Sequence, residues 1–90
     1  MQHKGTVYLI HFDKPYKHAR HYIGFTTDLN SRLEQHRNGN GARLMEVIKE
    51  NNIQWCITRT WENVTRHYER RLKNRKNAKY LCPICNKKGG

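Results

Sequence analysis

Three kinds of side chain that can act on a phosphate group lie close together between residues 21 and 36. Tyr22 stands in a short apolar run, and Arg32 and His36 follow it, four residues apart. A guanidinium can bind phosphate in a bidentate manner, and an imidazole can transfer protons near pH 7. Residues four apart are neighbours on a helix surface, so a helix here would present both side chains to one region. This stretch predicts a site that can hold a phosphate.

A second tyrosine, Tyr8, lies in another run of β-branched and aromatic residues. Tyrosines in strands are most often half-buried packing residues with the hydroxyl at the edge. A tyrosine can instead take a proton from an attacking water if a nearby cation or metal lowers its pKa. Both interpretations of Tyr8 and Tyr22 remain open at this point.

Acidic residues are scarce, and Glu69 is the strongest candidate for a metal ligand. The other six acidic residues fall in a loop, at predicted helix ends or on polar helix faces, whereas Glu69 lies beside an apolar helical stripe. Mg²⁺ commonly binds through one or two carboxylates, with water and substrate phosphate completing its shell. The simpler alternative is an ion pair with Lys73, four residues on, on a solvated face.

The cysteine pair Cys82 and Cys85, in the order Cys-Pro-Ile-Cys, is similar to half of a zinc site. A complete structural site needs four ligands, and the third cysteine, Cys56, lies in a predicted strand. We favour thiols on a loosely held tail. The alternative is zinc, shared with a histidine or with another chain.

The predicted elements form a single small α+β domain. β-branched and aromatic runs predict strands over residues 5–12, 21–25 and 53–60, with an exposed hairpin loop over 13–20. Helices are expected over 28–37, 42–50 and 61–76, the last with a buried stripe of Trp61, Val64, Tyr68 and Leu72. The order β-β-α-α-β-α predicts a three-stranded antiparallel sheet flanked by helices.

Size and charge restrict the partners. Ninety residues fit one domain, here residues 1–80 followed by a basic tail over 81–90. A net charge of +11 favours a polyanionic partner, and nucleic acid leads. The chain lacks a long apolar run and a signal peptide, so we expect no membrane partner and an intracellular location.

The ordered set of motifs resembles the GIY-YIG nuclease superfamily over about residues 5–75. In that family a first triplet ending in tyrosine and a second reading Tyr-Ile-Gly lie on adjacent strands. Here the first triplet is the variant Thr6-Val7-Tyr8, and the second, Tyr22-Ile23-Gly24, is literal. Arg32, His36 and Glu69 follow in the expected order.

The resemblance implies an endonuclease that hydrolyses phosphodiester bonds in DNA with one Mg²⁺, for which Mn²⁺ can substitute, and with no small-molecule cofactor. By resemblance, Tyr8 and Tyr22 orient or deprotonate the water, with Tyr8 the first choice as base. Arg32 stabilises phosphate charge, His36 assists proton transfer and Glu69 binds the metal. The family often has an asparagine a dozen residues after the glutamate; Leu81 occupies that region here, so we assign no such role.

Exposed cations are expected to contact the phosphate backbone, with little preference for sequence in a chain this short. The residues assigned to this role are Lys14, Lys17, Arg20, Arg37, Arg66, Arg70 and Lys73. The competing interpretation is a non-catalytic basic module that binds nucleic acid, in one version stabilised by zinc.

Overall fold

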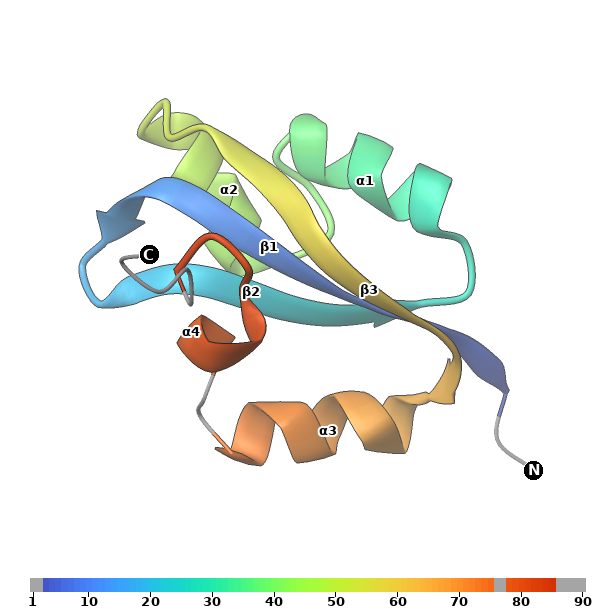
Figure 1. Ribbon diagram of the computed structural model, residues 1–90. Coiled ribbons are helices and arrows are strands. Elements are labelled where there is room, and N and C mark those ends of the chain that lie inside the picture. The colour runs from blue at the N-terminus through green and yellow to red at the C-terminus, as the bar shows by residue number, and fades with distance from the viewer. Residues whose placement is uncertain (1–2, 76–77, 86–90) are drawn as a thin grey trace.

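The computed structural model describes residues 3–75 and 78–85 and has a three-stranded antiparallel sheet at its centre (Figure 1). The strands are β1 (Lys4–Tyr16), β2 (Ala19–Thr26) and β3 (Trp55–Thr65), in the spatial order β2-β1-β3. The helices are α1 (Leu29–Arg37), α2 (Arg43–Glu50), α3 (Arg66–Arg75) and the short α4 (Ala78–Leu81). The predicted α+β class and the order β-β-α-α-β-α are confirmed, with α4 as an addition.

The helices cover both faces of the sheet. In Figure 1, α1 and α2 lie on one side of the sheet and α3 and α4 on the other. Side chains alternate between the faces of a strand, so the central strand β1 supplies two cores. Tyr8, Ile10 and Phe12 pack with Met45 and Ile48 of α2. The opposite face packs against α3, and its buried members are Val7, Leu9, Ile23, Phe25, Leu72 and Cys82.

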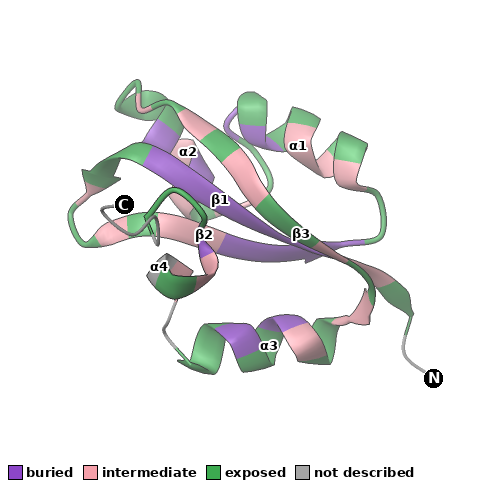
Figure 2. Ribbon diagram, viewed as in Figure 1, coloured by how far each residue is buried: buried purple, intermediate pink, exposed green. Residues whose placement is uncertain are grey.

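The most deeply buried strands are those with helices packed on both faces of the sheet. Figure 2 shows long buried stretches on β1 and β2, whereas β3 has only intermediate and exposed positions. The apolar side of α2 packs against the sheet, since Met45 and Ile48 are completely buried. Asp28 caps α1, because its side chain accepts a hydrogen bond from the backbone N–H of Ser31.

The predicted start of the last helix was wrong. Residues 61–65 belong to β3, and α3 begins at Arg66. On β1, Gly5 and Val7 are two positions apart, but their partners Val64 and Trp61 are three apart, so β3 contains a bulge. Asn63 lies within it at φ 61°. The extra residue turns Trp61 and Val64 toward the same core, which reproduces helical spacing in a strand. The last position of the predicted helix, Lys76, lies outside the described residues.

The predicted hairpin loop over 13–20 is also corrected. Tyr16 pairs with Ala19, which leaves only Lys17 and His18 at the turn, and Lys17 adopts the positive φ of 55°. The register shifts between His11 and Tyr16, so the extra residues of β1 are accommodated as an irregular extension of the strand.

Candidate active site

The two tyrosines of the motif meet across β1 and β2. Tyr8 pairs with Gly24, and Tyr22 lies two positions from Gly24 on the same strand. The two rings are 6.2 Å apart between centroids, and Tyr8 is completely buried. A β-carbon on Gly24 would overlap the phenol of Tyr8 and lie 2.9 Å from the Tyr22 ring. Glycine therefore provides the space in which the Tyr8 phenol lies, which explains this residue in the Tyr-Ile-Gly triplet.

His36 contacts the Tyr8 phenol from the last turn of α1. Its Nε2 lies 2.8 Å from the Tyr8 hydroxyl, and its Nδ1 lies 3.2 Å from the carbonyl oxygen of Asn40. A carbonyl oxygen can only accept a hydrogen bond, so Nδ1 carries the proton and Nε2 accepts from the phenol. Burial lowers the pKa of His36, only partly offset by the Asn40 contact, and Arg32 lowers it further. The imidazole is therefore a neutral proton acceptor for Tyr8.

Arg32, one turn before His36 on α1, acts on the same phenol. Burial raises the pKa of Tyr8 well above its ordinary value, and the neighbouring Tyr22 raises it further. The guanidinium of Arg32 opposes this rise through its charge and a hydrogen bond, while the charge of Glu69 adds to it. Tyr8 is thus protonated at neutral pH, and ionising it requires an acceptor such as His36.

Glu69 is buried on α3, at the edge of the core rather than in bulk solvent. Its Oε2 lies 3.3 Å from Lys73 Nζ, and the same ammonium lies 5.6 Å from the centroid of the Tyr22 ring. The alternative for Glu69, an ion pair with Lys73, is present in the structure, but the pair does not lie on a solvated face, since the Glu69 side chain is only 12% exposed. Lys73 therefore lies near both the Glu69 carboxylate and the Tyr22 ring, and the charge of Glu69 raises the pKa of Tyr8.

A divalent metal fits this carboxylate by its chemistry. Mg²⁺ is commonly held by one or two carboxylates plus water and substrate phosphate, and a nearly buried carboxylate gains most from a cation. Lys73 already supplies one positive charge there, but its own side chain is half exposed and can turn to solvent. A metal at Glu69 would replace that contact.

The cations assigned to the phosphate backbone are all exposed, in three places. Lys14, Lys17 and Arg20 lie at the β1–β2 hairpin, Arg37 ends α1, and the rest lie on α3. Arg37 pairs with Glu34 at 3.5 Å, and Arg66 lies over the Phe25 ring. Lys73 differs from the others, because it is held against Glu69 in the candidate site.

Sequence reasoning missed three residues near these groups. Asn40 fixes the tautomer of His36 through its backbone, and no side-chain pattern could have indicated it. Trp55 lies edge-on to His36 at 6.4 Å, where both line a pocket of about 680 Å³ between α1 and the start of β3. His11 was also missed: it pairs with His21 across β1 and β2 and approaches Cys82, in a group that could hold a metal. Counting outward from the turn would have placed His21 opposite Lys14, because the register of β1 and β2 shifts between His11 and Tyr16.

Cys82 is completely buried, so the chain is packed against the sheet up to this residue rather than loosely held. The end of the predicted tail, residues 86–90, lies outside the described residues. None of the described helices has the length and apolarity needed to cross a membrane.

The fold and the site define a small α+β domain in which a phenol, an imidazole and a guanidinium interact, and in which the charge of a nearly buried carboxylate on α3 acts on the same phenol. The GIY-YIG catalytic domain model matches residues 4–81. The chain therefore belongs to the GIY-YIG family, which implies a nuclease-type function. No curated protein and no solved structure matches it at a significant level.

Proposed function

We propose that this domain is an endonuclease that hydrolyses phosphodiester bonds in DNA with one Mg²⁺ held by Glu69. Membership of a family of nucleases supports the reaction type. The net charge of +11 supports a polyanionic substrate. The exposed cations assigned to DNA binding would contact phosphates rather than bases, which favours weak sequence preference or selectivity for DNA shape.

The observation that carries the proposal is the connection from Tyr8 to His36 to Asn40. Hydrogen bonds of 2.8 Å and 3.2 Å align the phenol, the imidazole and a backbone carbonyl. A purely structural tyrosine does not need a neutral imidazole as its acceptor. In the proposed reaction Tyr8 takes a proton from the attacking water while its own proton passes to Nε2 of His36.

Arg32 and Tyr22 complete the proposed site. The Arg32 guanidinium lowers the pKa of the Tyr8 phenol and would stabilise the charge that gathers on the phosphate oxygens. Tyr22, beside Tyr8, would orient the water. Mg²⁺ at Glu69 would supply Lewis-acid stabilisation of the phosphate, worth several kcal/mol in enzymes of this type (about 10²-fold or more in rate).

Nicking of supercoiled plasmid by Glu69→Gln tests the proposal. We expect wild-type nicking with Mg²⁺ or Mn²⁺ and none with EDTA. Glu69→Gln should reduce the rate by at least about 10²-fold while its circular dichroism and DNA affinity stay unchanged. The matched control is Glu50→Gln at the exposed end of α2, which should nick like the wild type.

The ion pair between Glu69 and Lys73 favours the second candidate function, a basic module that binds nucleic acid without cutting it. This function would be supported by tight DNA binding with no nicking in either metal, on plain, branched and single-stranded substrates. That result would contradict the nuclease proposal.

A further inference from the structure

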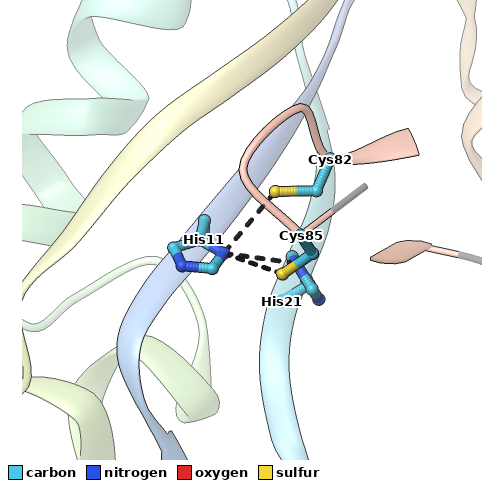
Figure 3. A group of neighbouring side chains, drawn as sticks. All are labelled: His11, His21, Cys82 and Cys85. Atoms are coloured by element: carbon cyan, nitrogen blue, oxygen red, sulfur yellow. Dashed lines mark hydrogen bonds between the residues drawn. The ribbon is translucent and has the colours of Figure 1, made fainter. Parts of the chain in front are cut away.

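A second group of metal-ligand side chains lies apart from the tyrosines. Figure 3 shows His11 of β1, His21 of β2, and Cys82 and Cys85 of the segment after α4, with their ligand atoms turned toward one another. His11 and His21 are cross-strand partners. The cysteines are more than 70 residues from His11 in sequence, so the group exists only in the folded chain.

The spacing of the ligand atoms is that of a tetrahedral metal site. His11 Nδ1 and His21 Nε2 are 3.4 Å apart, and three of the four nitrogen to sulfur distances are 3.3, 3.4 and 3.5 Å. Zn–N bonds of about 2.0 Å and Zn–S bonds of about 2.3 Å place two tetrahedral nitrogens about 3.4 Å apart, and nitrogen and sulfur about 3.6 Å apart. All four ligand atoms lie within 4.8 Å of one another.

Hydrogen bonds alone do not account for this arrangement. Nδ1 of His11 has three neighbours within 3.5 Å: His21 Nε2 and the sulfurs of Cys82 and Cys85. A ring nitrogen has either one hydrogen or one lone pair in the ring plane, so it serves one of them well. A cation at the centre would engage all four residues at once, each through one atom.

Burial and charge favour a closed structural site. His11 is buried and Cys82 is completely buried against the α3 side of the sheet, while Cys85 lies at the surface. Four protein ligands leave no open position for a substrate, as in structural zinc sites. Two thiolates and two neutral imidazoles around Zn²⁺ carry no net charge, which limits the cost of burial in a basic chain.

We propose that His11, His21, Cys82 and Cys85 bind one Zn²⁺ ion that fastens the chain after α4 to the β1–β2 hairpin. Thiolate and imidazole ligands in tetrahedral geometry select Zn²⁺ over Mg²⁺, which prefers six oxygen ligands. The two cysteine thiols bind as thiolates and release their protons to solvent. A helix as short as α4 (Ala78–Leu81) gains little stability from itself, so the metal would hold this segment in place.

The experiment is metal analysis of the full-length chain purified with Zn²⁺ and without chelator. We expect one Zn²⁺ per chain by elemental analysis and by native mass spectrometry. Cys85→Ser should weaken Zn²⁺ binding by at least about 100-fold, since it removes a ligand itself. Cys56→Ser on β3, the third cysteine, is the matched control and should keep the full zinc content.

Thermal unfolding supplies a readout that is independent of DNA cleavage. Removal of the metal by a chelator should lower Tm, and Zn²⁺ should restore it where Mg²⁺ does not. A wild-type chain without zinc, a chain that holds iron instead, or equal zinc content in Cys85→Ser and wild type would overturn the proposal. If Cys85→Ser does not fold, the zinc content of the wild type and of Cys56→Ser decides whether the proposal holds.

Discussion

At the scale of single residues, the candidate site depends on keeping two groups neutral. Burial raises the pKa of Tyr8 and lowers that of His36, so the phenol keeps its proton and the imidazole can accept it. The carbonyl of Asn40 fixes which nitrogen accepts. Arg32 favours both states needed for proton transfer, since its charge stabilises an ionised phenol and keeps the imidazole neutral before transfer.

Replacing Arg32 with alanine should lower turnover far more than DNA binding. The guanidinium is expected to stabilise charge that develops in the transition state, and loss of one such donor typically costs about 10²–10³-fold in kcat. Other exposed cations retain the affinity. The measurement is kcat and DNA affinity of Arg32→Ala, compared with Arg37→Ala on the exposed face of the same helix. Equal losses in rate and affinity would contradict a transition-state role.

The lowered pKa of His36 predicts an acid limit to activity. As pH falls through that pKa, Nε2 gains a proton and can no longer accept from Tyr8. The fall in kcat/KM should therefore occur below the ordinary histidine value of about 6.5. Because the unfolded chain binds this proton at the higher pH, the native state also loses stability as pH drops from about 6.5 toward the lowered pKa.

The matched variant for the pH prediction is His36→Gln, measured beside the wild type from pH 5 to 8. It should lose activity across the range and show a smaller acid-induced fall in Tm. An acid limb above the ordinary histidine value, or one that persists unchanged in the variant, would refute the assignment.

At the scale of elements, α3 positions Glu69 by packing against the sheet. Leu72 and Glu69 are the buried residues of α3, and Tyr68 and Trp61 pack on the same core. Because β3 continues through the bulge, α3 begins only at Arg66. This start determines where along the sheet the Glu69 carboxylate lies. A change in this packing should therefore affect both stability and activity.

Leu72→Ala should destabilise the domain by about 2–5 kcal/mol, because it leaves a cavity in the core under α3. For a domain of this size that corresponds to a fall in Tm of at least about 8 °C. Thermal melts and nicking rates of Leu72→Ala and of Asn74→Ala, which is exposed on the same helix, provide the comparison. A similar Tm in both variants would show that α3 is not anchored through Leu72.

At the scale of the whole molecule, positive charge dominates. Cations gather at the hairpin tip and on α3, while the described ion pairs are few and two of the three are exposed. Exposed pairs add little stability, so the excess charge is available to a polyanion. The proposed zinc site, neutral when occupied, would join the hairpin to the C-terminal segment without changing this charge.

DNA affinity should depend steeply on salt, because each phosphate contact releases counterions and contributes about −0.9 to the slope of log K against log salt. Removing three hairpin cations in Lys14→Gln/Lys17→Gln/Arg20→Gln should reduce that slope by about 2–3. Arg43→Gln, whose partner Glu46 lies 2.7 Å away, is the control and should change it by less than about 1. A flat titration of the wild type would refute backbone contact.

The fold class, the central part of each strand and the helices α1 and α2 could be predicted from the amino-acid sequence, and the family motifs could be recognised in it. These features follow from runs of β-branched and aromatic residues and from the spacing of apolar residues. Such patterns act over only a few residues. The literal Tyr-Ile-Gly triplet was also recognisable before the fold was known.

Contacts between residues that are distant in the sequence became known only from the folded structure. The bulge in β3 made strand residues look helical, because one inserted residue changes a spacing of two into three. The burial of Glu69, the Asn40 carbonyl on His36 and the meeting of His11 with Cys82 all depend on strand register and on segments distant in the chain. Such contacts arise from the packing of whole elements, which no local spacing encodes.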